Sequence, residues 1–210
     1  DTSTHGWGTM PLETMDASEM GAELATLEGD ASLDVAANLP AREEALYLLA
    51  FLEDLVERQG PDAAALQARI DALRRRLERA NEQLFAEWWA LLADGTATAA
   101  EIRRRLNPYT AYRPDAVGYR HTRYEAIDVL VGGALGLDEA PEETVAREPG
   151  MIHLEFTPTS VVLEMVDRVL MGPEDVFVDL GAGLGQVAIL VHLLTSVRAR
   201  GVELQPGYAA

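Results

Sequence analysis

A strand-like run that ends in a glycine-rich turn constrains the fold more than any other part of this sequence. Residues 176–180 read Val-Phe-Val-Asp-Leu, and apolar residues recur at helical spacing from Gln186 onward. Between them stand three alternating glycines, Gly181, Gly183 and Gly185. A second apolar stretch, residues 200–204, follows the expected helix and contains Glu203. Because two parallel strands need a crossover, the sequence predicts a strand–turn–helix–strand unit that binds a nucleotide-type cofactor.

Two acidic residues flank this turn. Asp179 stands two residues before Gly181, and Glu203 stands 22 residues after it (203 − 181 = 22). That spacing is close to the roughly 20 residues expected for a carboxylate that accepts hydrogen bonds from ribose hydroxyls. Dinucleotide sites usually read G-x-G-x-x-G and bind a pyrophosphate anion, whereas the spacing here is G-x-G-x-G. A fixed carboxylate would repel that anion, so the pattern favours a cofactor that carries an ammonium and a sulfonium.

The motif Asp-Leu-Gly-Ala-Gly-Leu-Gly, with Glu203 at the end of the next strand, resembles the first two motifs of class I methyltransferases that use S-adenosylmethionine. Upstream, Phe156-Thr-Pro-Thr159 precedes an amphipathic helix through Val162 and Val169. This order is similar to the disruptor-of-telomeric-silencing family of histone-lysine methyltransferases. The resemblance covers about residues 150–208. It implies an α/β fold, with a helical N-terminal region followed by the first half of a Rossmann-like class I domain.

The resemblance also implies a cofactor, S-adenosyl-L-methionine, and its contacts. In that family a threonine-containing segment and the glycine loop both touch the cofactor. The candidate cofactor-binding residues here are Thr157, Thr159, Asp179, Gly181, Ala182, Gly183, Gly185, Gln186 and Glu203. The acceptor implied is a protein lysine-type amine, methylated by direct in-line displacement. No catalytic residue is assigned, and where the family has Glu-Thr this chain has Pro158-Thr159, so the acceptor stays open.

Two other interpretations remain. The chain could be a helical interaction module joined to a non-catalytic remnant of a cofactor fold, although the intact acids and glycines argue against decay. It could also be a nicotinamide-dependent oxidoreductase, which the glycine spacing and Asp179 disfavour.

Composition excludes several classes of function. The net charge is −18, and an acidic chain repels a phosphate backbone, so we expect no nucleic-acid partner. The absence of cysteine excludes disulfides and thiolate metal sites, and the four histidines lack metal-ligand spacing. No apolar run reaches the roughly 20 residues that span a membrane, and no secretory signal is visible. We therefore expect a cytoplasmic protein with neither a metal site nor a membrane segment.

Four parts follow one another along the chain. We expect a flexible tail at 1–18, a helical domain at 19–137, an acidic linker at 138–150 and the start of the methyltransferase domain at 151–210. Only two strands, near 176–180 and 199–204, are found for a sheet that usually has seven. We therefore expect a C-terminally incomplete chain with little activity alone, and its unpaired sheet edge would favour association.

Apolar spacing predicts the helices of the 19–137 domain. They are expected at 41–59, from Pro61 to about Ala93, at 98–106 and at 124–135, and the first two should form an antiparallel hairpin. Trp88 continues the apolar stripe of the long helix and is expected in the core, with Trp89 half exposed. The arginine triplets at 74–76 and 103–105 are expected to pair with acids close in sequence, namely Asp71, Glu78, Glu82 and Glu101. The tyrosine- and arginine-rich segment 109–124 stays open between a lid over the cofactor and a packed connector.

Overall fold

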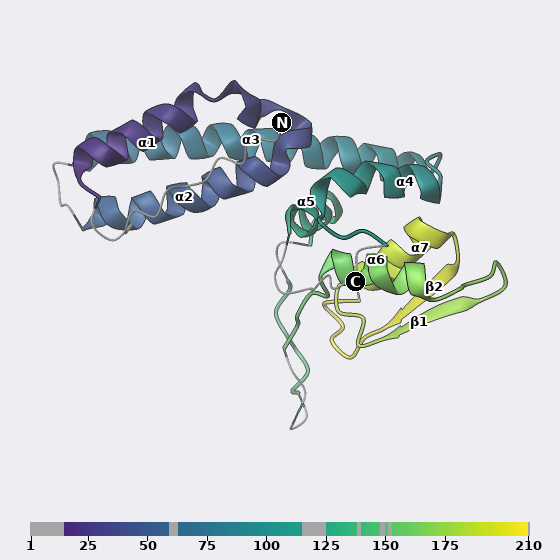
Figure 1. Cartoon of the computed structure of the whole chain (residues 1–210). Coiled ribbons are helices and arrows are strands. Elements are labelled where there is room, and N and C mark those ends of the chain that lie inside the picture. Colours follow the sequence, from purple (N-terminus) through teal and green to yellow (C-terminus); the bar gives the residue numbers. More distant parts are fainter. Residues whose placement is uncertain are drawn as a thin grey trace. The chain divides into compact units, whose positions relative to one another are not determined.

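The computed structural model describes residues 15–58, 63–114, 125–137, 140–147, 150 and 153–209. Helices hold most of these residues, and one parallel two-stranded sheet lies near the C-terminus (Figure 1). The chain forms two compact units, residues 1–80 and 81–210. The boundary between these two units lies at residue 80, whereas the sequence predicts domain boundaries near residues 18, 137 and 150. The predicted boundaries stay a prediction. None of the helices in the described residues is long and apolar enough to cross a membrane.

The first unit consists of helices and tight turns. Its elements are α1 (Ala17–Gly29), the 3-10 turns η2 (Ala31–Asp34) and η3 (Ala36–Asn38), α2 (Leu39–Glu57) and the start of α3 (Ala64–Asp94). A capping box begins α1, in which Asp16 accepts from the backbone N–H of Glu19 and Glu19 accepts from that of Asp16. Helix α1 thus begins inside the segment 1–18 that was expected to be a tail, and residues 1–14 lie outside the described residues.

Apolar side chains from three helices form the core of this unit. Leu24 of α1, Leu49 and Leu52 of α2, and Ile70 and Leu77 of α3 are completely buried. The predicted helices at 41–59 and to about 93 are confirmed, because the apolar stripes repeat at helical spacing over both segments. The start predicted at Pro61 lies outside the described residues.

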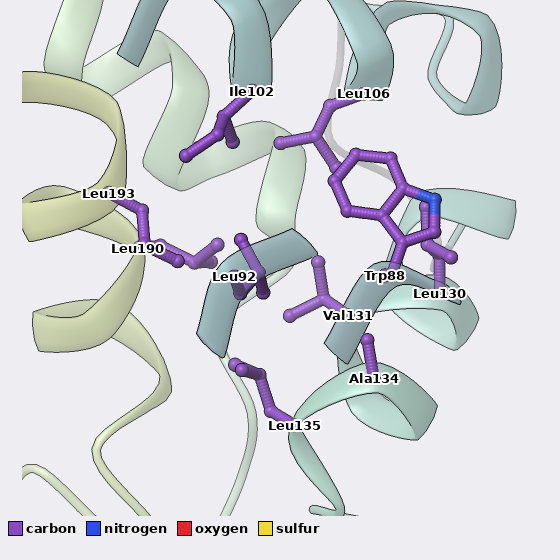
Figure 2. A pocket seen from close by; sticks show the side chains of 10 residues that line it. All are labelled: Trp88, Leu92, Ile102, Leu106, Leu130, Val131, Ala134, Leu135, Leu190 and Leu193. Atoms are coloured by element: carbon purple, nitrogen blue, oxygen red, sulfur yellow. The ribbon is translucent and has the colours of Figure 1, made fainter. Parts of the chain in front are cut away.

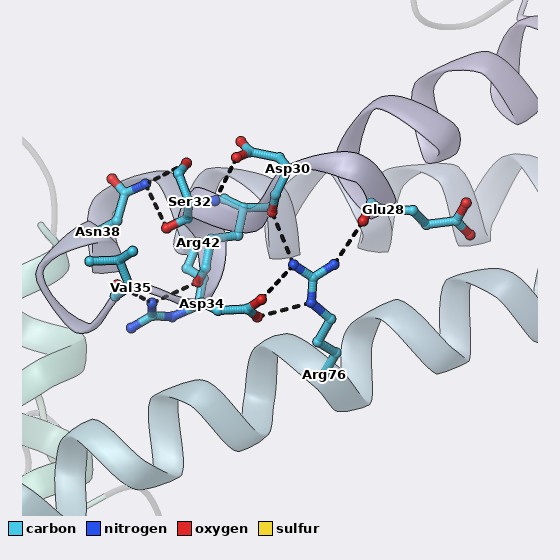
Figure 3. A network of polar contacts seen from close by, with 9 residues as sticks. Glu28, Asp30, Ser32, Asp34, Val35, Asn38, Arg42 and Arg76 are labelled. Atoms are coloured by element: carbon cyan, nitrogen blue, oxygen red, sulfur yellow. Dashed lines mark hydrogen bonds and ion pairs between the residues drawn. The ribbon is translucent and has the colours of Figure 1, made fainter.

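Two arginines hold the chain between α1 and α2 (Figure 3). Arg42 is completely buried and donates to the carbonyl oxygens of Leu33 and Val35, both at 2.8 Å. Arg76 donates to both carboxylate oxygens of Asp34, at 2.9 and 2.8 Å, and to the backbone oxygen of Glu28 at 2.9 Å. These bonds give side-chain donors to carbonyl groups at the end of α1 and in the 3-10 turns that follow it.

Among the described residues, the predicted pairing is confirmed for five of the six arginines in the triplets, but most of the predicted partners are wrong. Glu101 does pair with Arg105 at 2.8 Å. Arg74 instead binds Glu53 at 2.6 Å, and Arg103 binds Asp167 at 2.5 Å. Sequence spacing identifies partners one helical turn away, whereas these partners come from other helices.

The second unit combines helices with the sheet. Its elements are the end of α3, α4 (Ala99–Leu106), the 3-10 turn η5 (Asn107–Tyr109), α5 (Ala126–Leu135), α6 (Thr159–Arg168), β1 (Val176–Leu180), α7 (Gln186–Thr195) and β2 (Arg198–Val202). Thr98 caps α4 through its hydroxyl, and Gly136 ends α5 in the left-handed conformation with φ 66°. Both helix ends lie where the sequence predicts them.

Aromatic residues pack in the core of the second unit. Trp88 is 8% exposed and meets Tyr109 edge to face, with ring centroids 6.4 Å apart, while Trp89 is 57% exposed, as predicted. Tyr112 is buried as well, and burial raises its pKa to about 12, with further contributions from its hydrogen bond to Asp167. The described start of the 109–124 segment is thus packed in the core. Whether the whole segment is a lid or a connector stays open, because residues 115–124 lie outside the described residues.

The sheet is parallel, and Asp179 of β1 pairs in register with Gly201 of β2. Helix α7 packs against both strands and against α6 (Figure 1). Phe177 and Asp179 are partly buried, whereas Val178 and Leu180 on the other face are 51% and 79% exposed. The predicted strand–helix–strand unit and α/β class are therefore confirmed. A complete Rossmann-like half and association through this sheet stay predictions.

Candidate functional site

The glycine turn joins β1 to α7 at the carboxyl end of the sheet. Gly181, Gly183 and Gly185 have φ values of 79°, 54° and 82°, which side chains rarely tolerate. The backbone N–H groups of Gly181 and Ala182 both donate to the carbonyl oxygen of Val202, at 2.8 and 3.1 Å. The end of β2 thus fixes the start of the turn.

Close approaches give a second reason for glycine at position 183 and explain Gly201. A Cβ on Gly183 would lie 2.5 Å from the Cδ1 atom of Leu154, because the segment before α6 packs on the turn. A Cβ on Gly201 would lie 2.7 Å from the Cβ of Ala182. A Cβ on Gly181, by contrast, would meet nothing within 4 Å, so space remains beside the first glycine. This open side is where a cofactor could approach the backbone.

Glu203 points to the glycine turn. One carboxylate oxygen accepts from the N–H of Gly183 at 2.7 Å, and the other accepts from the N–H of Gln205 at 2.8 Å. The hydrogen bond from Gln205, followed by those from Gly183 and Leu204, holds the pKa of Glu203 below its usual value, although burial opposes the shift. Glu203 is therefore an anion, and its oxygens keep further acceptor capacity.

Asp179 lies beside this anion. Burial first, and then the charge of Glu203, raise the pKa of Asp179 above its usual value. Within the described residues no arginine or histidine forms an ion pair with Asp179 or Glu203. The two carboxylates therefore make an electronegative site that a cationic ligand would stabilise.

Thr159 and Gln186 each begin a helix of the site. Thr159 is the first residue of α6 and Gln186 the first of α7, and these helices pack on each other. Thr159 is 0% and Gln186 6% exposed. Across the part of the chain that the structure describes, neither Oγ1 of Thr159 nor Oε1 of Gln186 has a hydrogen-bond partner. Since buried polar atoms are nearly always paired, these two oxygens point to a missing partner.

Thr157 is the least informative of the predicted residues. It lies partly buried in the segment before α6, and its hydroxyl has no hydrogen bond to any of the described residues. The structure thus brings Asp179, Ala182, the glycines and Glu203 together, and it places Thr159 and Gln186 on helices next to the turn. Their role as cofactor contacts stays a prediction.

The sequence did not reveal the role of Gln205, which is 4% exposed. Its side-chain oxygen accepts from the N–H groups of Thr144 and Val145, both at 3.0 Å, and its amide donates to the carbonyl of Val145 at 2.6 Å. The segment predicted as a linker is therefore bound to the residues that follow Glu203. Three bonds at a separation of about 60 residues leave no local signal in a sequence.

A small pocket elsewhere in the second unit is a packing feature (Figure 2). It lies between the end of α3, α4, α5 and α7, and apolar side chains such as Trp88, Ile102 and Leu190 line it. Its cavity volume is about 20 Å³, which is the room that one water molecule needs, and its lining offers no polar partner. No group of His, Asp and Glu in the described ranges could hold a metal ion.

Comparison with known families agrees with this geometry. Residues 154–209 match the family model described as "Histone methylation protein DOT1". The match begins at Leu154, which packs on Gly183, and runs through α6, the glycine turn and Glu203. It supports a DOT1-like methyltransferase family, the one that the motif resembles, for this part of the chain. No curated protein and no solved structure matches the chain.

Proposed function

We propose that this protein transfers a methyl group from S-adenosylmethionine to an amine of a protein substrate. The family match over residues 154–209 supports methyl transfer. The family match does not identify the cofactor or the acceptor. We infer both from the chemistry of the site.

One observation carries the choice of cofactor. The backbone N–H groups of Gly181, Ala182, Gly183 and Gly185 all donate to acceptors within the chain. A pyrophosphate site needs such donors free, as at other glycine turns before helices. This turn instead offers carboxylates and oxygen acceptors. S-adenosylmethionine, with an ammonium, a sulfonium, ribose hydroxyls and an adenine amine, supplies the matching donors and positive charge.

Each residue has a defined part in this proposal. Glu203 accepts from ribose hydroxyls, Asp179 neutralises positive charge, and the orphan oxygens of Thr159 and Gln186 accept from donor groups of the cofactor. The bound cofactor supplies an electrophilic methyl group. The chain supplies orientation, because holding the reactants in near-attack geometry accounts for much of such a rate enhancement.

The proposed acceptor is a basic protein segment. The chain carries a net charge of −18, which attracts cationic polypeptides and accelerates their association. The matched family is described by histone methylation, in agreement with a lysine-type amine. The cytoplasmic location expected from the sequence is part of this proposal.

Isothermal titration calorimetry tests the cofactor. We expect heat on titration of S-adenosylmethionine and none with NAD, and Asp179→Asn should weaken the binding of the cationic cofactor. Heat with NAD alone would favour an oxidoreductase. Heat with neither would favour a helical interaction module with an inactive remnant.

Transfer of a tritiated methyl group tests the acceptor. Because the chain is expected to have little activity alone, we expect a low level of label on histones. We expect far less label on the same histones after chemical acetylation of their lysines, because acetylation removes the amine nucleophile. Equal labelling of both samples would exclude a lysine acceptor.

A further inference from the structure

Asp128 joins the starts of two helices through one carboxylate. It is the third residue of α5, and its Oδ2 atom accepts from the N–H of Glu125 at 2.7 Å. Its Oδ1 atom accepts from the N–H of Thr159, the first residue of α6, at 2.6 Å. Both oxygens are thus used, and the second bond spans 31 residues of sequence.

Helix α6 lacks a cap of its own. Pro158 at the N-cap position has no side-chain acceptor for the orphan N–H groups of the first turn. Asp128 supplies the acceptor from another helix, and its negative charge also suits the positive end of the helix dipole. The position of Thr159 therefore depends on a residue outside the matched segment 154–209.

The far end of α6 is anchored from the same region. Asp167 accepts from Arg103 of α4 at 2.5 Å and from the hydroxyl of Tyr112 at 3.0 Å. The helix cannot slide along its axis without breaking bonds at both ends. Of these two anchors, Asp128 is the one that accepts from Thr159, whose hydroxyl has no hydrogen-bond partner within the described part of the chain.

We infer that Asp128 is a positioning residue, which holds the first turn of α6 so that the Thr159 hydroxyl can accept from the cofactor. This inference rests on the proposed function. The side chain of Asp128 acts through the backbone of Thr159 and does not itself touch the cofactor. Helical residues outside the family match would then take part in cofactor recognition.

A double-mutant cycle on cofactor affinity separates this role from a purely structural cap. Asp128→Asn keeps the shape but can accept only one of the two N–H bonds, and Thr159→Val removes the hydroxyl. We expect each single variant to weaken S-adenosylmethionine binding about fivefold in calorimetry. The double variant should also bind about fivefold more weakly, rather than the roughly 25-fold of independent effects.

Asp175→Asn is the matched control, since Asp175 accepts one backbone N–H, from Gly172 at 2.7 Å, in an exposed turn. It should bind like the unchanged protein. If Asp128→Asn does not unfold cooperatively, Asp128→Glu displaces the carboxylate by one methylene and enters the same cycle.

The outcomes are distinct. Absence of binding to the unchanged protein would remove the proposed function and this inference with it. Binding to the unchanged protein with additive effects in the cycle would overturn the inference alone, because additivity means that Asp128 does not act through the Thr159 hydroxyl. Non-additive effects support it.

Discussion

Thr159→Val should stabilise the free protein while it weakens cofactor binding. The Thr159 side chain is 0% exposed, and its hydroxyl oxygen has no hydrogen-bond partner among the described residues. A buried polar group without a partner is destabilising by about 1–3 kcal/mol, and valine has nearly the same shape without the hydroxyl. A buried polar group that lowers the stability of the free protein is typical of a residue that contacts a ligand.

The magnitudes follow from this penalty. Taking the lower end, the substitution should raise the free energy of unfolding by about 1 kcal/mol. For a chain of 210 residues that corresponds to a Tm increase of about 2–4 °C. Loss of one hydrogen bond to the cofactor should reduce affinity by about 1 kcal/mol, which is about fivefold in Kd.

Two measurements on the same samples check both signs. Thermal unfolding followed by circular dichroism gives Tm without ligand, and calorimetric titration gives Kd for S-adenosylmethionine. Thr110→Val is the matched control, because Thr110 is 6% exposed and its hydroxyl accepts from the N–H of Tyr112 at 3.1 Å. That variant should lose about 1–3 kcal/mol of stability and keep its affinity.

A fall in the Tm of Thr159→Val would refute the reasoning, because it would mean that the hydroxyl already contributes to the folded state. If the Tm of Thr159→Val rises but its affinity for S-adenosylmethionine is unchanged, the Thr159 hydroxyl does not contact the cofactor, and Thr159 is not part of the site.

Three further predictions concern charge and packing. Asp179→Asn should be more stable than the unchanged protein at pH 7 but not below about pH 4. The reason is that the pKa of Asp179 is raised in the folded protein, so the unchanged protein loses stability as the pH rises through that pKa. Acid titration monitored by circular dichroism checks this. Gly201→Ala should lower the free energy of unfolding by about 1–3 kcal/mol. Adding Ala182→Gly should restore the lost stability, because it removes the atom that lies 2.7 Å from the new Cβ. Urea unfolding of the single and double variants measures both effects. Arg42→Met should lower the free energy of unfolding by about 1–3 kcal/mol in the same assay, because it takes the arginine donor away from the buried carbonyl of Leu33. The carbonyl of Val35 keeps its bond from the N–H of Asn38. A loss below about 1 kcal/mol would contradict that account.

Local patterns predicted much of the fold. The capping threonine Thr98, the terminal Gly136 and the alternating glycines each act within a few residues, and the structure places their helix ends and turn where the sequence indicates. Apolar stripes at helical spacing identified α2 and α3 for the same reason, because the period of a helix is a local property.

Contacts across long separations could not be predicted. Arg74 binds Glu53 and Arg103 binds Asp167, at separations of 21 and 64 residues. The sequence contains many acids, and only packing selects which one lies near each arginine. Likewise, the motif identified Glu203 but not that its carboxylate already accepts from Gly183 and Gln205.

The sequence by itself determined the strand, the glycine turn, the helix and the flanking acids, because these depend on backbone freedom and on side-chain spacing within one unit. Only the tertiary structure decided how the turn uses its N–H groups, which oxygens stay without partners, and that Asp128 reaches Thr159. Hydrogen-bond geometry depends on distances of a few ångströms between segments far apart in the chain, and those distances exist only after the helices pack.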